Sequence, residues 1–232
     1  MTTNGANLED LIVSVATPSD GPELTRLLQD AYGQSTDFTM QSDTFFHEHF
    51  KERTAVVIAR VGLSLLGTMR ADVILGSEDL SYRDEGFLLP EMVPALLLCR
   101  AATVSDHRAS GLNSVMRAYC IEAAMSLGLQ SVVGEVYRNA PRTRLMAELG
   151  YSFFPLKAQC DGDRTYHSEC LFATLAVKQT GASALSILRS RNAKLDRRSV
   201  WVGPSLADTL IAWDKNLDPD SEAPSQGDSC PT

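Results

Sequence analysis

The chain has 232 residues, of which 44% are hydrophobic and 22% are charged, and its formal net charge is −8. This length and apolar fraction predict a globular domain with a substantial core. The acidic balance argues against general binding to nucleic acids or anionic membranes, so any phosphate site must be a local basic patch. The sequence contains no apolar run of about 18 residues, so we expect no membrane span. The first ten residues lack the basic region and apolar core of a signal peptide.

The cysteines and histidines favour neither disulfides nor a metal site. The cysteines are odd in number and scattered, and no two of them form a CxxC pair, so we expect a reducing, cytoplasmic environment. His47 and His49 stand two residues apart and would point to different faces of a helix, which makes them a weak pair of metal ligands. The cysteines are Cys99, Cys120, Cys160, Cys170 and Cys230.

The first half of the chain alternates apolar strands with amphipathic helices. A helix capped by the Pro18–Asp20 segment ends at Gly33, and a hairpin turns at Gly62. Two prolines mark a long surface connection before residue 95. In chain order, the predicted elements are a strand at 11–15, a helix at 21–32, an amphipathic segment at 42–50, and strands at 54–61 and 63–75.

The second half contains a β-α-β unit. A right-handed crossover through the helix would make its two strands parallel in an otherwise antiparallel sheet. This order predicts an α/β (α+β) fold with a mixed, mostly antiparallel sheet. The predicted elements are strands at 95–104 and 130–137 around a helix at 113–127, then a helix from Asn139 to Gly150, strands at 152–156 and 169–177, and helices at 183–195 and 205–217.

These elements divide the chain into three parts. The order of elements up to residue 178 predicts one globular domain (1–178). Two further helices form a C-terminal helical extension (179–216), which we expect to cover a substrate site or to mediate dimerisation. The polar segment at 217–232 has the composition of a disordered tail.

The junction between the strand at 95–104 and the next helix points to an anion site. The strand ends in a basic, glycine-containing turn and enters the helix with almost no loop. Such a turn leaves free backbone N–H groups at a helix start, where an anion binds well.

The turn Arg108-Ala109-Ser110-Gly111-Leu112-Asn113 resembles the Arg/Gln-x-x-Gly-x-Gly/Ala motif of the GNAT superfamily of N-acyltransferases. A second match is the helix running from Asn139 through Arg142 to Gly150-Tyr151. The resemblance covers residues 10–177 and implies a GNAT-like sheet with a splay between the central parallel strands. It also implies that the donor, acyl carrier protein or coenzyme A, binds at Arg108, Ala109, Ser110, Gly111, Leu112, Asn113, Asn139 and Arg142.

Two positions depart from that pattern. Asn113 replaces the final small residue of the turn. Met146 replaces a tyrosine that often protonates the departing thiolate in the family. Tyr137 or Tyr119 could substitute for it, or the thiolate could leave without a protein acid.

Two arginines indicate a branch of the superfamily. Gly67-Thr68-Met69-Arg70 and Cys99-Arg100-Ala101-Ala102-Thr103 resemble segments of the acyl-homoserine-lactone synthases and long-chain N-acyl amino acid synthases. Those enzymes move a fatty acyl chain from acyl carrier protein, or sometimes coenzyme A, to an amino group. Leu97 stands where lactone synthases usually have glutamate, which favours an amino-acid-like acceptor.

Aminolysis of a thioester needs a stabilised oxyanion and a base. We expect backbone N–H groups near Thr103 and Val104 to bind the oxyanion and the pantetheine amides. Small side chains at Ala101 and Ala102 would let a ligand approach closely.

Glu135 is the preferred base, because a partly buried carboxylate more readily accepts a proton near neutral pH. It shares a strand face with Tyr137, a second substrate-binding candidate. The alternative for Glu135 is a structural ion pair with Arg100. His107 is a second candidate base, although it lies in the phosphate turn. Arg100 and Arg70 suit the carboxylate of the acceptor.

The sequence therefore predicts an N-acyltransferase that uses a pantetheine thioester and a small primary amine, with an N-acyl amino acid synthase as the favoured form. The alternatives are a short-chain acetyl-CoA-dependent N-acetyltransferase and a non-catalytic ligand-binding module. Acyl length, acceptor, carrier and oligomeric state stay open. An acyl tunnel would be lined by Phe45, Phe46, Phe50, Phe153, Phe154 and Phe172, although each also suits a plain core.

Overall fold

The computed structural model describes residues 8, 10–33, 35–40, 42–80, 88–156 and 164–215. Its centre is an eight-stranded sheet in the order β10-β1-β3-β4-β5-β6-β9-β7. The strands are β1 (Leu11–Val15), β3 (Thr54–Val61), β4 (Ser64–Ile74), β5 (Ala95–Thr103), β6 (Ser131–Tyr137), β7 (Ser152–Pro155), β9 (Cys170–Ala176) and β10 (Ser199–Val202). A separate antiparallel pair joins β2 (Phe38–Met40) and β8 (Arg164–Tyr166).

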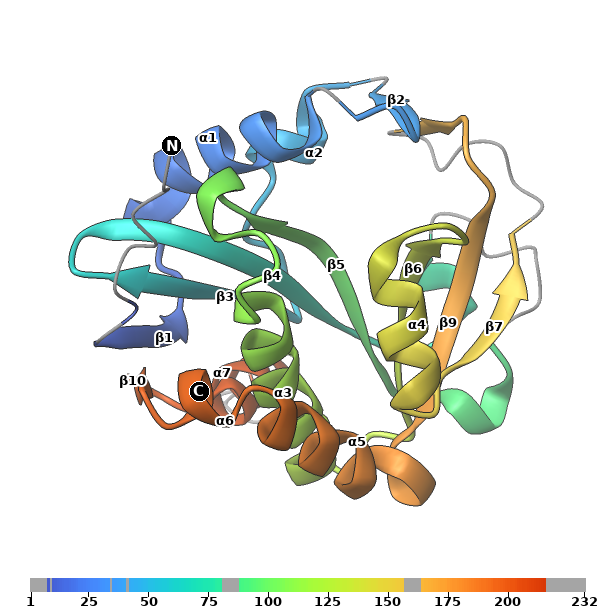
Figure 1. Cartoon of the computed structure of the whole chain (residues 1–232). Coiled ribbons are helices and arrows are strands. Elements are labelled where there is room, and N and C mark those ends of the chain that lie inside the picture. Colours follow the sequence, from blue (N-terminus) through green and yellow to red (C-terminus); the bar gives the residue numbers. More distant parts are fainter. Residues whose placement is uncertain are drawn as a thin grey trace, which may run out of the picture.

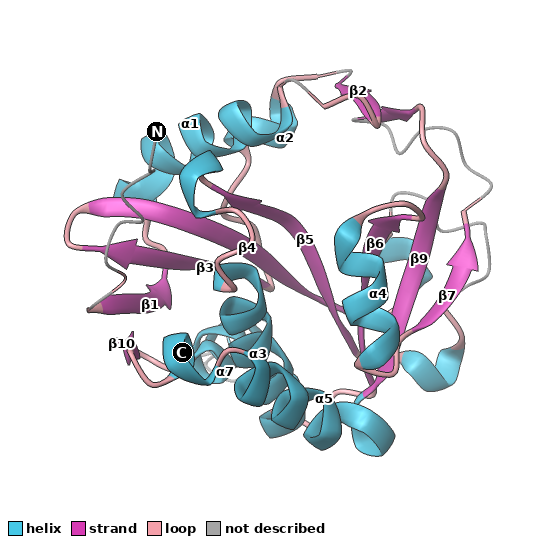
Figure 2. Cartoon of the chain, viewed as in Figure 1, coloured by secondary structure: helices cyan, strands magenta, loops and turns pink. Residues whose placement is uncertain are grey.

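Helices lie on both sides of the sheet, as Figure 2 shows. One side carries α1 (Gly21–Tyr32) and α2 (Thr44–His47), and the other carries α3 (Leu112–Ser126), α5 (Val177–Arg191), α6 (Ala193–Asp196) and α7 (Leu206–Lys215) (Figure 1). The helix α4 (Pro141–Glu148) follows β6. Short 3₁₀ turns lie at η1 (Pro18–Asp20), η2 (Ser77–Asp79), η4 (Pro90–Met92) and η5 (Ser105–His107).

The two central strands confirm the predicted mixed sheet. β5 and β6 are parallel, whereas their outer neighbours β4 and β9 are antiparallel to them. The β5–β6 pairing runs from Ala95↔Ser131 to Leu98↔Gly134 and then stops, although both strands continue. The strands diverge beyond this point (Figure 1). Gly134 allows the last close approach, because a Cβ there would lie 2.8 Å from the carbonyl oxygen of Leu98.

A β-bulge in β5 determines which side chains face the α1/α2 side. Arg100 has φ +49°, and the register with β4 shifts between Thr68 and Arg70. A bulged residue breaks the alternation of side chains along a strand. Cys99 and Arg100 therefore face the same side, where they contact Asp72 and Phe45 respectively.

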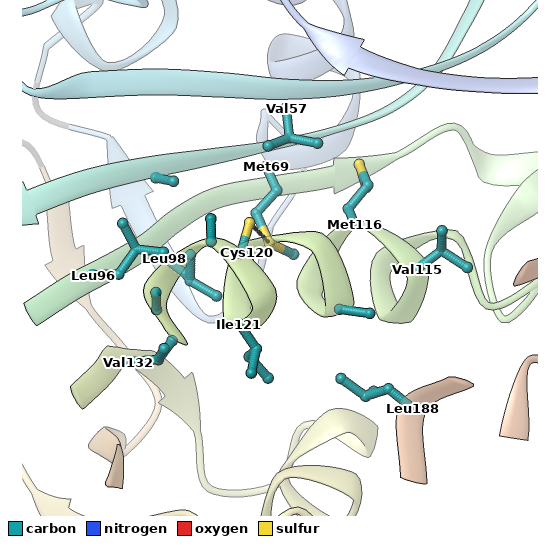
Figure 3. Close-up of a cluster of buried hydrophobic side chains, with 14 of the residues drawn as sticks. Val57, Met69, Leu96, Leu98, Val115, Met116, Cys120, Ile121, Val132 and Leu188 are labelled. Atoms are coloured by element: carbon teal, nitrogen blue, oxygen red, sulfur yellow. Dashed lines mark hydrogen bonds between the residues drawn. The ribbon is translucent and has the colours of Figure 1, made fainter. Parts of the chain in front are cut away.

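The main core lies between the sheet and the helices of the α3 side. In Figure 3, Val57, Met69 and Leu96 from the strands pack against Met116, Cys120 and Ile121 of α3. Side chains this well buried account for most of the stabilisation. The C-terminal segment contributes to the same cluster through Ala184, Leu188, Leu195, Leu206 and Leu210.

Several elements differ from the sequence prediction. The predicted C-terminal helices correspond to α5 with α6 and to α7, but β10 between them was not predicted and pairs in parallel with β1. The amphipathic segment at 42–50 is helical only over α2, because Glu48 leaves the helical region (ψ +78°) and its carbonyl oxygen is held by arginines of the sheet. The tail at 217–232, Cys160 and Cys230 lie outside the described residues.

No helix in the described ranges is long and apolar enough to cross a membrane. Within those same ranges, no group of three or more His, Cys, Asp or Glu side chains is placed to hold a metal ion. His49 instead shares a hydrogen bond with the Thr25 hydroxyl, at 2.9 Å between Nε2 and Oγ1.

Candidate active site at the splayed strands

A cavity of about 210 Å³ lies where β5 and β6 separate. Side chains from both faces of the sheet line it, so the gap between the strands connects the two faces. From the α1/α2 face come Tyr32, Phe38, Phe45, Cys99, Arg100, Glu135, Tyr137 and Arg164. From the α3 face and α4 come Leu98, Val136, Arg117 and Arg142.

The predicted anion turn directly precedes α3. Ala109 and Gly111 have positive φ (+62° and +95°), which folds the backbone tightly around the helix start. Among the described residues, the N–H groups of Gly111, Leu112 and Asn113 have no acceptor, because the first helical bond runs from Val115 to Gly111. The Ser114 N–H also has no acceptor among the described residues, so four free amides lie at this end of α3.

Other predicted members of this site are placed differently. The Ser110 N–H donates to the His107 carbonyl at 3.2 Å and is not free, whereas its hydroxyl is buried without a partner. Arg108 and Asn139 are exposed, and Ala140 rather than Asn139 precedes α4. Arg142 lines the cavity instead of the turn, with Nη2 3.5 Å from the Glu135 carbonyl oxygen.

The N–H groups of Thr103 and Val104, which we expected to bind the oxyanion, point in different directions. The Val104 N–H donates to the Leu66 carbonyl at 2.9 Å, so its predicted role was wrong. Amides alternate in direction along an antiparallel pair, so the Thr103 N–H points away from β4 and toward the gap. Ala102 is buried against α1 and α2, and its N–H faces β4.

Glu135 lies in the cavity in an ion pair, but its partner is not Arg100. Glu135 Oε2 is 2.9 Å from Arg164 Nη2 and 3.3 Å from the Tyr166 hydroxyl. Both members of the ion pair keep just under a fifth of their side-chain surface exposed. Arg164 comes from the short strand β8, whose three residues carry no periodic pattern, so no local signal predicted this contact.

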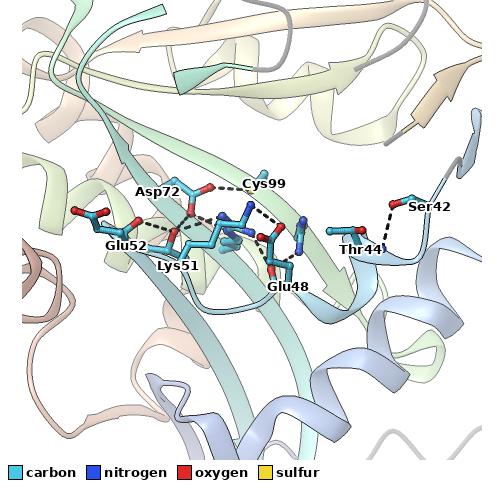
Figure 4. A network of polar contacts seen from close by, with 10 residues as sticks. Ser42, Thr44, Glu48, Lys51, Glu52, Asp72 and Cys99 are labelled. Carbon is cyan, nitrogen blue, oxygen red and sulfur yellow. Dashed lines mark hydrogen bonds and ion pairs between the residues drawn. The ribbon is translucent and has the colours of Figure 1, made fainter. Parts of the chain in front are cut away.

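Arg70 and Arg100 meet at one backbone oxygen. Both donate to the Glu48 carbonyl, at 3.0 Å and 2.6 Å respectively. Figure 4 shows the polar network around Glu48 and Asp72. Arg70 Nε also donates to Asp72 at 2.7 Å, and Arg70 Nη2 donates to Thr54 at 3.4 Å. Burial works against the charge of Arg70, but Asp72 outweighs it and raises the pKa of the guanidinium. Arg70 therefore holds this segment on the sheet, and its side chain also lines the cavity.

Arg100 and Tyr137 both face the cavity. The Arg100 guanidinium lies 4.6 Å from the centre of the Phe45 ring. Tyr137 stacks on Phe38, with ring centres 6.0 Å apart, and its hydroxyl is buried without a partner. Burial raises the pKa of Tyr137 far above its usual value, so its hydroxyl stays protonated.

The two other positions considered for an acid do not reach the cavity. Met146 is buried in the main core. Tyr119 packs on Trp201, with ring centres 4.9 Å apart, in a separate groove between α3 and α7. Tyr119 therefore cannot replace the tyrosine missing from α4.

Cys99 lines the cavity but is not a nucleophile. Burial, reinforced by Asp72, raises the pKa of its thiol to about 12, despite the nearby arginines. Because the thiolate is the reactive form, this cysteine is inert at neutral pH.

Of the six phenylalanines considered for an acyl tunnel, Phe45 alone lines this cavity. Phe46, Phe153, Phe154 and Phe172 pack in or against core clusters, and Phe50 is exposed. The sequence could not separate these roles, because both require an apolar ring.

No protein-family profile and no curated protein matches the sequence. Solved structures match its fold. The N-acyl amino acid synthase FeeM from uncultured soil microbes has a TM-score of 0.59 at 11% identity, covering 78% of this chain and 98% of its own. The CoA-dependent acyl-homoserine lactone synthase BjaI has a TM-score of 0.57 at 14% identity, covering 88% and 99%.

The ribosomal-protein-S18-alanine N-acetyltransferase from Escherichia coli has a TM-score of 0.53 at 15% identity, covering 72% of this chain and 94% of its own. The structure therefore has the GNAT fold, as the sequence resemblance implied. Within that fold it is similar both to acetyltransferases and to the two synthases.

Proposed function

We propose that this chain is an N-acyltransferase that moves an acyl group from the pantetheine thioester of acyl carrier protein or coenzyme A to a small primary amine. The observation that carries the proposal is the cavity at the β5–β6 splay, which is lined from both faces of the sheet. Such a cavity lets a thioester enter from one face and an amine from the other.

The donor would bind on the α3 face. The free amides of Gly111, Leu112 and Asn113 suit a phosphate, since a helix start carries partial positive charge. Exposed Arg108 adds a guanidinium beside them. From there the pantetheine arm would follow the unpaired side of β5, where the Thr103 N–H can meet an amide or the developing oxyanion.

The acceptor would bind on the α1/α2 face as an amino-acid-like molecule. Glu135 supplies a carboxylate for its ammonium group, and Arg164 and Arg100 supply guanidinium groups for its carboxylate. Once the ammonium has lost one proton to solvent, the neutral amine attacks the thioester carbon, and Glu135 takes the second proton from the attacking nitrogen. The N–C bond forms, the C–S bond breaks, and the carrier leaves as a thiolate.

The neighbours' described activities agree with this class of reaction. BjaI is described with isopentyl-CoA, and FeeM is named an N-acyl amino acid synthase. This chain has Leu97, which lines the cavity, at the position where lactone synthases usually have a glutamate, and the missing carboxylate favours the amino-acid acceptor. An acetyltransferase remains the second outcome of the test, because a neighbour of that name shares the fold.

The test is thiol release by the purified chain from matched donors: acetyl-, octanoyl- and palmitoyl-coenzyme A and the corresponding acyl carrier protein thioesters. Each is paired with amino acids and with amines that lack a carboxylate, and products are identified by mass spectrometry. Turnover of long-chain donors with amino acids supports the synthase. Turnover of acetyl-CoA alone supports the acetyltransferase, and donor binding without any release overturns the enzyme proposal.

A further inference from the structure

Arg117 is a buried arginine that no step above uses. It lies on α3, keeps 7% of its surface exposed, and lines the cavity from the α3 face. Its Nη1 donates to the Tyr151 hydroxyl at 3.2 Å, and its guanidinium lies 5.9 Å from the centre of that ring. Both contacts are to a neutral group. No carboxylate within the described ranges pairs with Arg117.

Burying a guanidinium without a counter-charge raises the free energy of the folded state, because most of its five N–H donors lose their water partners without forming new hydrogen bonds. The other titratable groups around Arg117 do not supply a compensating negative charge. Burial raises the pKa values of Cys120 and Tyr151, so both are neutral at physiological pH. Glu135 is paired with Arg164, and Arg142 is itself a cation. The site is therefore suited to an anion that arrives with a ligand.

The position of Arg117 selects among the anions of the proposed reaction. Arg117 comes five residues after Leu112, the first residue of α3. At a rise of about 1.5 Å per residue, it lies about 8 Å farther along the helix axis. It thus lies farther from the solvent than the phosphate turn and lines the cavity at the gap, where the proposed reaction takes place. The acceptor's carboxylate would lie on the opposite face, with Arg100 and Arg164.

We propose that Arg117 stabilises the thiolate of the departing carrier, an inference that rests on the proposed acyl transfer. As the N–C bond forms and the C–S bond breaks, the bonding electron pair stays on sulfur, and the amine proton goes to Glu135. The guanidinium compensates the new negative charge without donating a proton. The carrier can then dissociate as the thiolate or take a proton from water.

A first experiment needs no turnover. Coenzyme A bound to the full chain is titrated by the ultraviolet absorbance of its thiolate, with desulfo-coenzyme A as the blank for protein ionisation. A cation within a few ångströms should lower the pKa of the bound thiol by about 1–3 units. Arg117→Met should abolish the shift, and Arg117→Lys should keep part of it. Arg189→Met, which removes a surface partner of Glu122, should change nothing.

A second experiment varies the leaving group. Arg117→Met should lower kcat about 10²–10³-fold for an alkyl thioester such as acyl-coenzyme A, in the range of a lost oxyanion donor. It should lower kcat far less for an aryl thioester, whose thiolate is already stable. An equal loss for both donors would assign Arg117 a purely structural role.

The outcomes separate the two proposals. If coenzyme A does not bind the wild-type chain, the donor site itself is wrong. If it binds and its thiol titrates as in free solution, the donor site stands and the role of Arg117 is overturned. Should Arg117→Met fail to fold, the wild-type titration and Arg117→Lys still decide.

Discussion

Asn192 stands directly behind Gly111. A Cβ at position 111 would lie 2.3 Å from the Asn192 side-chain oxygen, and Gly111 also has φ +95°. Asn192 is at the junction of α5 and α6 and is held there by a bond from its Nδ2 to the Leu188 carbonyl at 2.8 Å. The C-terminal helices thus form the back of the anion turn, far from it in sequence.

Gly111→Ala should destabilise the fold by roughly 2–5 kcal/mol, from backbone strain and steric overlap together, and should weaken coenzyme A binding. Gly128→Ala is the matched control, since Gly128 has φ +67° but open space around it. It should cost about 1–2 kcal/mol and leave binding intact. Denaturant unfolding and calorimetric titration measure both. Equal effects of the two substitutions on binding would contradict the close packing at the turn.

Glu135→Gln should lower kcat by about 10²–10⁴-fold, because an amide cannot accept the amine proton. Donor binding should persist, since Glu135 lies on the acceptor side. The control is Glu169→Gln, which breaks a surface ion pair with Arg138 at 2.6 Å. Steady-state kinetics with an amino-acid acceptor provide the measurement. A variant that retains most of its rate would remove Glu135 from the chemistry.

Tyr137→Phe should leave the fold as stable as the wild type or slightly more stable, because the deleted hydroxyl is buried without a partner. If that hydroxyl meets the substrate, kcat/KM should fall by about tenfold, the value of one hydrogen bond of about 1.4 kcal/mol. Thermal unfolding and kinetics on the same preparation test this prediction. A large loss of stability would show that the hydroxyl has a structural partner.

The fold should become less stable as pH rises above about 9. Burial raises the pKa values of Cys99 and Cys120 to about 12 from 9, so the folded chain keeps two protons that the unfolded chain releases. Their stabilisation is complete below pH 9 and is lost toward pH 12, at up to about 3 kcal/mol per pH unit for both thiols. Cys120→Ala should reduce the slope between pH 9 and 10 in denaturant unfolding, while the buried tyrosines, whose pKa values are also raised, contribute to the slope that remains. An unchanged slope would contradict the burial of that thiol.

Leu188→Ala should destabilise the chain by about 2–5 kcal/mol, as expected for a fully buried leucine. Leu188 is 1% exposed on α5, whereas Ile211 on α7 is 40% exposed. Ile211→Ala should therefore cost less than about 1 kcal/mol. Urea unfolding compares the two. Similar small effects would mean that the C-terminal helices contribute little to the core.

Local patterns predicted the central elements well. The strand at 54–61 matches β3, and the strand at 130–137 and the helix at 113–127 match β6 and α3 to within a residue at each end. Their apolar periodicity is strong and their ends carry glycine or capping signals. The parallel pair and its splay followed from the element order and the resemblance, and both are confirmed.

The walls of the cavity were harder to predict, because they depend on contacts between distant segments. Arg164 reaches Glu135 from a three-residue strand, and Tyr32 donates to the Ala101 carbonyl at 2.6 Å from the end of α1. The bulge at Arg100 reverses the expected alternation, so Cys99 and Arg100 share a face. No local pattern encodes these three features.

The oxygen shared by Arg70 and Arg100 belongs to the backbone of residue 48, not to its side chain. Other residues at that position would present the same acceptor, whereas the Glu48 carboxylate adds an ion pair with Lys51 and an attraction to both arginines. The segment after α2 is therefore attached to the sheet through a backbone oxygen that substitution at residue 48 preserves. The attachment still requires both arginines as donors. Within a set of orthologous sequences, the two arginines should be retained together, while position 48 should vary more than either of them.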